Sequence, residues 1–374
     1  MSKYVKCLGT SSYFPGEPIK FEDINSYLGD LNRVSPKLNK WINRVQPLMR
    51  ELLGVEYCYY AFDRETREYF DDNLTMSVKS AQMALDEAEL KAEDIDLLIF
   101  GGNHSEQMPP LSVRIQEELG IDICSEFHIH SNCTSIYKAI DIAYMYLKSG
   151  RFKNALVISS CVSSSFFIPE FYNQEQLTKE DVFLRWYLCD GAGAMVFSAE
   201  DKQDKGFYLK NSYIESAGGN KESAMGNRLP ARWNNPIDTF DKGLHHIRQV
   251  YLNQMKGMAH KEEDGKTIFY AALKRMLEQQ SIPLEDLKYF VVNMPSKSVR
   301  EYIMNECVEL GIPTDKVYSA VEEVGYAGPP AAVISIDQIL KKGDFKNGDL
   351  VFSFVMEVSK FMQAGFVLEY VEEV

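Results

Sequence analysis

Short apolar runs alternate with helical patterns along this chain. After Cys133, apolar side chains recur three or four residues apart as far as Leu147, and this spacing predicts an amphipathic helix that stops at Gly150. Four nearly continuous apolar runs are typical of short strands covered on both faces. Strands that alternate with helices predict mainly parallel sheets with helices packed on them, an α/β fold. The four runs are residues 97–102, 155–161, 289–293 and 349–355.

The pattern of the first half returns in the second half. Residues 85–101 recur as 277–293, which lie 192 positions later, and residues 147–159 recur as 340–353, which lie 193 positions later. Residues 131–150 match residues 324–343 in helical pattern and closing glycine. A coincidence of common helix–loop–strand patterns is the alternative. Register and order are both preserved over three segments, which favours a duplicated unit.

The repeat predicts two pseudo-symmetric halves, layered α/β/α/β/α. We expect an N-terminal half over residues 1–205 with an insertion at about 20–70. We expect a C-terminal half over residues 206–374 with an insertion at about 216–266. The insertions are rich in glycine, asparagine or charge, and loops of this kind often cover a site.

Composition narrows the class of protein. The chain has 374 residues, 45% of them hydrophobic and 25% charged, which is ordinary for a globular protein of two domains. A net charge of −14 disfavours nucleic acid as a partner. No apolar run approaches the roughly 20 residues that span a bilayer, and the N-terminus lacks the pattern of a signal peptide. We therefore expect a cytoplasmic protein without a membrane partner.

The cysteines point the same way. Their number is odd, they are widely spaced, and no CxxC pair occurs, which argues against a disulfide framework and against structural zinc. We expect reduced thiols, most of them buried, and no metal. The seven are Cys7, Cys58, Cys124, Cys133, Cys161, Cys189 and Cys307.

Cys133 is the candidate nucleophile. The strand-like segment EFHIH runs into it and the predicted helix runs out of it. The positive end of a helix dipole favours a thiolate there, and free N–H groups of the first turn can stabilise an oxyanion. The alternative is a buried cysteine that only fills space beside the sheet.

Three further segments carry a family resemblance. CDGAGAMVFSAE (189–200) resembles the GDGAGA stretch of 3-oxoacyl-ACP synthase III (KAS III), a branch of the thiolase superfamily. MPPLSVRIQEELGI (108–121) resembles the loop and helix that reach a partner's active site in that family. GYAGPPAAVISIDQIL (325–340) resembles its GNTSAAS-type helix start. The resemblance spans nearly the whole chain and implies a thiolase-like fold in which Cys133 carries an acyl group.

The chain departs from the family at its other catalytic positions. The resemblance places Asn293, in NMPS, where the family has histidine, and Tyr326, in GYAG, where it has asparagine. Cys133 precedes Gly150 by 17 residues and Tyr326 precedes Gly343 by 17, so Tyr326 is also the pseudo-symmetric mate of Cys133.

The family's glycine-rich turn also differs, because it falls on Val358, Ser359 and Lys360. The backbone N–H of Ser359 is a candidate oxyanion donor, although the tight glycine geometry is absent from the sequence.

The replaced residues provide hydrogen-bond donors but no general base. Asn293 and Tyr326 can both donate to an oxyanion, but neither accepts a proton near neutral pH. Transfer to a hydroxyl or amine needs a general base. His104, just after the strand at 97–102, is our candidate, since the related HMG-CoA synthase branch carries a catalytic glutamate in roughly this loop. The alternative is an exposed loop histidine.

Other titratable residues are weaker candidates for the same role. Glu106 shares the loop of His104, and Glu357 lies near the C-terminal turn. His128 and His130 share one face of the strand before Cys133, so that one of them approaches the thiol or both are core histidines. His245 and His246 fall in the second insertion, and the sequence does not predict where they lie relative to Cys133.

A basic segment predicts where a substrate enters. Residues 37–50 carry Lys37, Lys40, Arg44 and Arg50 without an acid, with Trp41 among them. In KAS III-like enzymes, a Trp and an Arg in this part of the chain hold the coenzyme A nucleotide. The resemblance therefore implies that Trp41, Arg44 and Arg50 receive coenzyme A or a phosphopantetheine arm. An amphipathic surface helix is the alternative.

The resemblance also implies partners. Family members are dimers, and Met108 is the residue expected to reach the neighbour's pocket. We expect acyl-CoA or an acyl carrier protein as donor, a homodimer or a heterodimer with a homologue, and no tightly bound cofactor.

Three functions remain open from the sequence. The favoured one is acyl transfer through Cys133 to a second substrate in a specialised pathway, forming an ester, an amide or an atypical C–C bond. The first alternative is the decarboxylative Claisen condensation of a KAS III in fatty-acid or polyketide synthesis. The second is a degenerate, non-catalytic subunit of a heterodimeric ketosynthase.

Overall fold

The computed structural model is built around one large sheet. It describes residues 2–103, 108–186, 188–227, 235–244, 247, 250–253, 260–262, 264–293 and 296–372. Among these residues, ten strands pair in the order β12-β11-β13-β14-β8-β1-β7-β6-β4-β5.

One half of the sheet comes from the first 200 residues. β6 pairs in parallel with β4, and β4 pairs in parallel with the edge strand β5. β7 is antiparallel to both β6 and β1. The strands are β1 (Tyr4–Tyr13), β7 (Gly191–Glu200), β6 (Asn154–Cys161), β4 (Leu97–Gly102) and β5 (Ser125–His130).

The other half repeats this arrangement. β13 and β12 pair in parallel with β11, and β14 is antiparallel to both β13 and β8. The halves join where β1 meets β8, at Lys6 opposite Tyr208 and Cys7 opposite Phe207. Matching order and direction are what a duplicated unit produces; the boundary at residues 205 and 206 stays a prediction. The strands are β8 (Gly206–Ser216), β14 (Met362–Val371), β13 (Leu350–Glu357), β11 (Leu287–Val292) and β12 (Val317–Tyr318).

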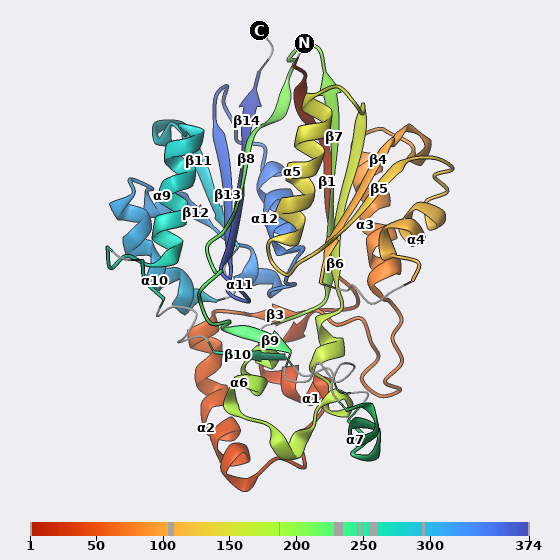
Figure 1. Cartoon of the computed structure of the whole chain (residues 1–374), viewed down its shortest axis with the longest axis vertical. Helices are drawn as coiled ribbons and strands as arrows, with labels where there is room; N and C mark the ends of the chain where they lie inside the picture. The colour runs from red at the N-terminus through yellow and green to blue at the C-terminus, as the bar shows by residue number, and fades with distance from the viewer. Residues whose placement is uncertain are drawn as a thin grey trace.

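Helices occupy three layers. α5 (Ser135–Lys148) and α12 (Ala331–Leu340) lie in the middle, between the two halves of the sheet (Figure 1). Their buried apolar side chains share one core cluster with strands of both halves. The outer layers hold α3 (Asn73–Glu87) and α4 (Leu111–Glu118) on one side, and α9 (Ile268–Gln280) and α10 (Lys297–Glu309) on the other. The predicted layered α/β architecture is therefore confirmed.

The sequence pattern explains the central elements. β4 is buried along its whole length, because helices cover both of its faces. α12 is buried on nearly all sides, as a helix in the middle layer must be, whereas α5 keeps some exposed positions. Gly150 and Gly343 follow the two helices with φ values of 73° and 71°, which glycine adopts without strain.

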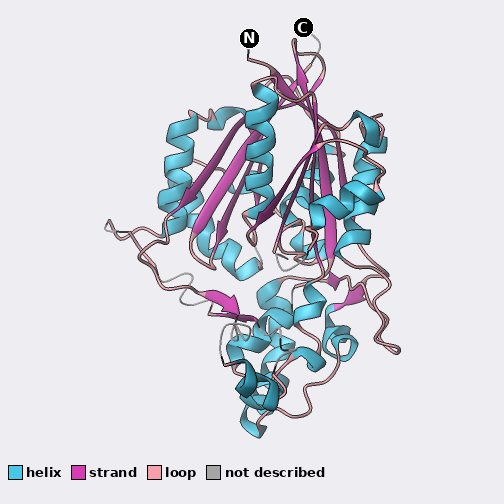
Figure 2. Cartoon of the chain, turned by 45° about the vertical axis from the view of Figure 1, so that its right-hand side comes forward, coloured by secondary structure: helices cyan, strands magenta, loops and turns pink. Residues whose placement is uncertain are grey.

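A smaller, mostly helical region lies beyond one end of the sheet (Figure 2). Ser35 caps α2 by accepting from the Leu38 N–H, and Gly54 ends it in the left-handed conformation. The region contains β2 (Ile19–Lys20), α1 (Ile24–Leu28), α2 (Pro36–Leu53), β3 (Tyr57–Cys58), α6 (Lys179–Val182), the 3-10 helix η6 (Phe183–Trp186), β9 (Met225–Asn227), α7 (Pro236–Asp241) and β10 (Val250–Leu252).

α11 (Val321–Val324) precedes α12. Further 3-10 helices are η1 (Phe21–Asp23), η2 (Ala92–Asp94), η3 (Ser163–Phe166), η4 (Pro169–Phe171), η5 (Gln174–Gln176), η8 (Leu284–Asp286) and η9 (Thr314–Lys316). In the part of the chain that the structure describes, no helix is both long and apolar enough to cross a bilayer.

Candidate active site

The carboxyl ends of the parallel strands open onto a cavity of about 270 Å³. Side chains that follow such strands converge at one edge of a sheet, which is where open α/β folds bind ligands. The walls are mostly apolar, and they include Phe166, Leu184, Leu188, Val250 and Leu252. The polar lining includes Asn103, His130, Cys133, Cys161, Asn293 and Tyr326.

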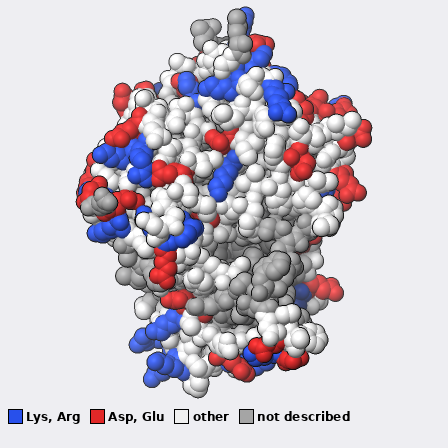
Figure 3. All heavy atoms as spheres, in the orientation of Figure 1, with Lys and Arg blue, Asp and Glu red and all other residues white. Residues whose placement is uncertain are grey.

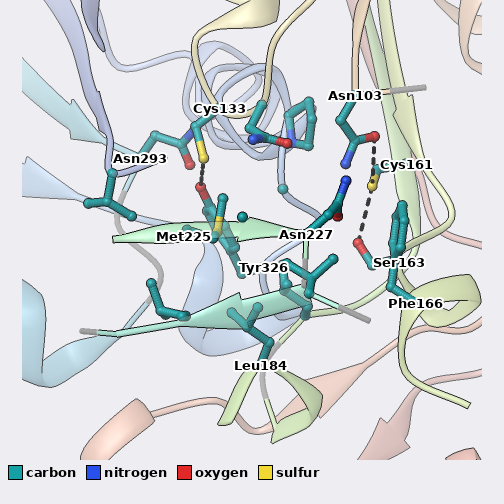
Figure 4. A pocket seen from close by; sticks show the side chains of 18 of the residues that line it. Asn103, Cys133, Cys161, Ser163, Phe166, Leu184, Met225, Asn227, Asn293 and Tyr326 are labelled. Carbon is teal, nitrogen blue, oxygen red and sulfur yellow. Dashed lines mark hydrogen bonds between the residues drawn. The ribbon is translucent and has the colours of Figure 1, made fainter. Parts of the chain in front are cut away.

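Cys133 and Tyr326 meet in this cavity. The Cys133 Sγ lies 3.0 Å from the Tyr326 Oη (Figure 4). The two residues are 193 positions apart, so the contact joins the start of α5 to the segment before α12. Cys133 itself lies in a turn, and the helix begins two residues later, at Ser135. The prediction that the helix begins at the cysteine is therefore corrected, since the Ser135 N–H closes a turn on the Asn132 carbonyl at 2.9 Å.

Asn293 lies next to this pair (Figure 4). It follows β11, and its backbone N–H donates to the Phe354 carbonyl at 3.2 Å. The residue is 5% exposed and lines the cavity. Neither side-chain amide atom has a hydrogen-bond partner among the described residues. Buried amides are normally bonded, so this one is available to a ligand.

Glu357 holds the turn around Cys133. It is the last residue of β13 and is 1% exposed. Its Oε2 accepts from the Thr134 backbone N–H at 2.9 Å and from the Thr134 hydroxyl at 2.6 Å. The Ser131 hydroxyl donates to the same oxygen at 3.1 Å, and the Ser359 hydroxyl donates to Oε1 at 2.5 Å. The Glu357 carboxylate thus accepts a hydrogen bond from the Thr134 backbone N–H, which is then not available to a ligand in the cavity.

This arrangement reverses one expectation about the thiol. Burial raises the pKa of Cys133 to about 12, and the negative charge of Glu357 is the next cause. The hydrogen bond from Tyr326 acts in the opposite direction. Burial and the Glu357 charge both act against the expectation that the start of the helix favours a thiolate, because desolvation and a nearby carboxylate favour the neutral thiol.

The two histidines of β5 lie in different surroundings. His130, at the end of β5, lines the cavity, whereas the His128 ring packs edge-on against Phe100 with ring centres 5.1 Å apart. Of the two residues, only His130 is placed at the site. His104, our candidate base, lies outside the described residues, as do Glu106, His245 and His246.

The C-terminal turn is built without glycine. The residue with a positive φ is Phe361, at 55°, which follows the three positions at 358–360. Its carbonyl accepts from the Ala217 N–H at 3.0 Å. A Cβ at Gly218 would lie 1.7 Å from the Lys360 carbonyl oxygen, so a glycine is needed in the loop after β8 instead. Val358 of this turn lines the cavity, and Ser359 turns its hydroxyl to Glu357.

The basic segment forms one face of α2. Lys37, Lys40 and Arg44 are exposed, and basic atoms gather over α2 at the lower left of Figure 3. Arg50 lies elsewhere on the helix and forms an ion pair with Glu22.

Trp41 links this face to the cavity wall. Its ring lies 5.7 Å from that of Trp186, and the Lys179 Nζ lies 5.4 Å from its centre. Leu184, two residues before Trp186, lines the cavity. Met108 is 95% exposed and precedes α4.

Sequence reasoning missed a second polar group. The Cys161 Sγ lies 3.2 Å from the Ser163 Oγ and 3.6 Å from the Asn103 Oδ1 (Figure 4). Cys161 ends β6, and Asn103 follows β4. Both strands were predicted, so the rule that carboxyl ends of parallel strands meet at one edge gives the signal that finds these residues.

Comparison with known proteins agrees with this arrangement. The family model of 3-oxoacyl-[acyl-carrier-protein] synthase III matches residues 127–218, which include Cys133 and the GAGA segment. A β-ketoacyl-[acyl-carrier-protein] synthase III from Clostridium perfringens is 25% identical over 355 residues, covering 93% of this chain and 94% of the relative. One from Neisseria gonorrhoeae is also 25% identical, covering 92% and 93%. The chain is therefore similar over most of its length to 3-oxoacyl-[acyl-carrier-protein] synthase III (KAS III) proteins.

Solved structures agree on the fold of this KAS III-like chain. AbyA1, described as a tetronic acid condensing enzyme, has a TM-score of 0.74 at 18% identity and covers 98% of this chain and 99% of its own. An OleA variant from Xanthomonas campestris, bound to lauric acid and lauroyl-CoA, has a TM-score of 0.76 at 17% identity, with 99% and 100% covered. The 3-oxoacyl-[acyl-carrier-protein] synthase III from Aquifex aeolicus has a TM-score of 0.68 at 20% identity, with 98% and 100% covered.

The curated relatives are thus named as synthases, and one structural neighbour is described as a condensing enzyme. Within the described ranges, no three His, Cys, Asp or Glu side chains gather as a metal site requires.

Proposed function

We propose that this KAS III-like enzyme carries an acyl group on Cys133 and passes it to a second substrate. The observation that supports this most directly is the contact between the Cys133 thiol and the Tyr326 hydroxyl, beside the unpartnered amide of Asn293, inside a largely apolar cavity. A nucleophile, two hydrogen-bond donors and an apolar enclosure are what acyl transfer through a thioester needs.

The first step is acylation. The Cys133 sulfur attacks the thioester carbonyl of an acyl-CoA or acyl carrier protein, a new C–S bond forms, and the bond to the carrier's sulfur breaks. The thiol proton passes through a base to the departing thiolate. His130 lines the cavity and joins His104 as a candidate for this base.

The second step uses the two donors. The Asn293 amide N–H and the Tyr326 O–H donate to the carbonyl oxygen as it becomes an oxyanion. Attack by an acceptor hydroxyl or amine gives an ester or amide and regenerates the Cys133 thiol. We assign this reaction to a specialised biosynthetic pathway, because Asn293 and Tyr326 stand where the family's histidine and asparagine are expected.

A decarboxylative Claisen condensation is the second candidate. The curated relatives are named β-ketoacyl synthases, and one structural neighbour is described as a condensing enzyme. Loss of CO₂ from a malonyl donor leaves an enolate that needs hydrogen-bond donors more than a base, and Asn293 and Tyr326 are donors.

The exposed face of α2 is our proposed entrance for the carrier. Lys37, Lys40 and Arg44 present three positive charges on an acidic protein, and the phosphates of coenzyme A or of a phosphopantetheine arm are anionic. We expect Arg44→Gln to raise KM for the donor several-fold with kcat unchanged, and the effect to shrink at high salt.

We also propose a dimer in which Met108 reaches the neighbouring subunit. Its nearly complete exposure in the single chain fits a residue that a partner covers. Light scattering on the purified chain tests this, and Met108→Asp is expected to shift a dimer toward monomer.

The test of acylation is intact-protein mass spectrometry with a panel of acyl-CoA and acyl carrier donors. We expect a mass increase of one acyl group that is lost in Cys133→Ala and kept in Cys161→Ala, since Cys161 is the matched cysteine of the same cavity. No adduct with any donor would instead favour a non-catalytic partner subunit. CO₂ release from malonyl donors distinguishes condensation from ester or amide formation.

A further inference from the structure

A second cavity, of about 310 Å³, lies between α2, the loop after α1, and η6. It shares no lining residue with the cavity of Cys133. Its wall is polar where the first is apolar, since five carboxamides surround it. They are Asn25, Asn32, Asn39, Asn43 and Gln46.

The floor of this second cavity carries a buried charge. Arg185 lines it and is 2% exposed. One guanidinium nitrogen, Nη2, donates to the Gly29 carbonyl at 2.6 Å, but Nε has no hydrogen-bond partner among the described residues. No carboxylate of the described residues forms an ion pair with it. Burying a guanidinium without a counter-charge costs several kcal/mol, so a group that supplies that charge would be bound favourably.

The surroundings do not neutralise this guanidinium. Burial lowers the pKa of Arg185, and the nearby charge of Arg67 acts in the same direction. Tyr172, Tyr60 and Asp30 oppose that effect; Asp30 is the one carboxylate among them, and it lies at the exposed rim of the cavity. Asn25 adds a second unmet group, because its buried Oδ1 lacks a hydrogen-bond donor among the described residues.

We propose that this cavity is a binding site for a small anion, a carboxylate or a phosphate monoester that also carries a hydroxyl group. The anionic oxygens would bond the guanidinium of Arg185, a group that binds both kinds of anion well. A hydroxyl would donate to the Asn25 Oδ1, and the remaining carboxamides would bond the polar body of the ligand. The site is separate from the entrance proposed for the carrier, because Lys37, Lys40 and Arg44 do not line it.

The position of Arg185 connects this site to the reactive cavity. Within η6, Leu184 lines the cavity of Cys133, Arg185 lines the second cavity, and Trp186 packs against Trp41. An anion that orders Arg185 therefore also orders a wall of the acyl cavity. It should also change the fluorescence of the adjacent Trp186.

The test is calorimetric titration of the full chain with inorganic phosphate and with citrate, against sodium chloride of equal ionic strength. We expect saturable binding of one equivalent of at least one anion, and a melting temperature that rises with its concentration. Citrate alone identifies a carboxylate site, and phosphate alone identifies a phosphate site. No saturable binding of either anion overturns the proposal.

Variants locate the site. Arg185→Gln should weaken binding roughly tenfold to a hundredfold, as expected for loss of a charged hydrogen bond. Lys202→Gln, which removes an exposed positive charge that lines neither cavity, should leave binding unchanged. If Arg185→Gln does not fold, Asn43→Asp tests the same point, because it places a negative charge at the rim and should also abolish binding. Unchanged binding in the folded Arg185→Gln protein, or in Asn43→Asp, contradicts the proposal.

Discussion

The starts of α5 and α12 occupy equivalent positions but offer different chemistry. Cys133 precedes Gly150, and Tyr326 precedes Gly343, by the same 17 residues. At α5, the backbone N–H of Thr134 donates a hydrogen bond to Glu357. At α12, residues 329 and 330 are prolines and have no N–H to offer.

The difference shows how a repeated scaffold can serve two roles. The start of α5 carries the proposed sulfur nucleophile, and the turn around it is held by contacts of Thr134 with the Glu357 carboxylate. The start of α12 extends a phenol to that sulfur. One copy supplies the proposed attacking atom and the other supplies a donor, so the site exists only where the two copies meet.

The largest effect that tests this contrast is the pH dependence of the thiol. Because burial and Glu357 raise the pKa of Cys133 from 9.0 to about 12, the thiolate fraction should rise about tenfold per pH unit. Alkylation of Cys133 by iodoacetamide should therefore accelerate roughly a thousandfold between pH 7 and pH 10 without a plateau. Cys133→Ser reports the background from other cysteines. A plateau near pH 8 would show an activated thiolate instead.

The same shift has a consequence for stability. The native state binds the thiol proton more tightly than the unfolded chain does. Its contribution to stability is fully present below pH 9 and is lost as the pH rises toward 12.

The next largest effect concerns the phenol. Tyr326→Phe removes the hydroxyl that contacts Cys133 and should lower turnover about a hundredfold, the usual cost of one oxyanion donor. Acylation by the donor should fall less, because Asn293 remains. Tyr318→Phe is a control outside the cavity, since the Tyr318 hydroxyl bonds Gln338. Full turnover in Tyr326→Phe would show that the Tyr326 hydroxyl, and with it the segment before α12, takes no part in the reaction.

Much of this framework follows from the sequence. The apolar runs located β4 and β6 to within a residue, and the repeat predicted that Tyr326 is the pseudo-symmetric mate of Cys133, which it contacts. These succeed because strands covered on both faces need continuous apolar residues, and because equal spacing in a duplicated fold gives equivalent positions.

The rest depends on contacts between distant segments. No local pattern indicates that Glu357, 223 residues from Thr134, takes its N–H. The raised pKa of Cys133 follows from that contact and from burial, so the sequence suggested the opposite shift. The convergence of Asn103 and Cys161 likewise needs the pairing order of the strands.

A smaller effect isolates the carboxylate of α5. Glu357→Gln keeps an acceptor for the Thr134 N–H but removes the charge that helps to raise the pKa of Cys133. Alkylation at pH 8 should accelerate about tenfold, which corresponds to one pKa unit. The exposed Glu175→Gln is the matched control. An unchanged rate in Glu357→Gln would assign the shift to burial alone.

The smallest expected effect is on the free energy of unfolding, and it concerns the backbone before α12. Gly325 and Gly328 have φ values of 72° and 73°, so alanine is strained at both, and the ψ of −177° at Gly325 is a conformation that essentially only glycine adopts, at a cost of about 1–3 kcal/mol for other residues. A Cβ at Gly325 would also lie 2.9 Å from the Tyr57 carbonyl oxygen, whereas one at Gly328 meets only the Cys161 Sγ at 3.8 Å.

Gly325→Ala should therefore lower the free energy of unfolding by about 1–3 kcal/mol more than Gly328→Ala does. Urea denaturation of the two variants measures this difference. Equal losses would mean that the packing of Gly325 against β3 is not required.

The central claim is that the sulfur at the start of α5 carries the acyl group. Peptide mapping after a rapid quench, with the donor that labels the protein best, tests it directly. We expect the acyl group on the peptide that contains Cys133, and its return to coenzyme A when excess free coenzyme A is added before the quench. An acyl group on Cys161, or a label on Cys133 that free coenzyme A cannot remove, would contradict the account.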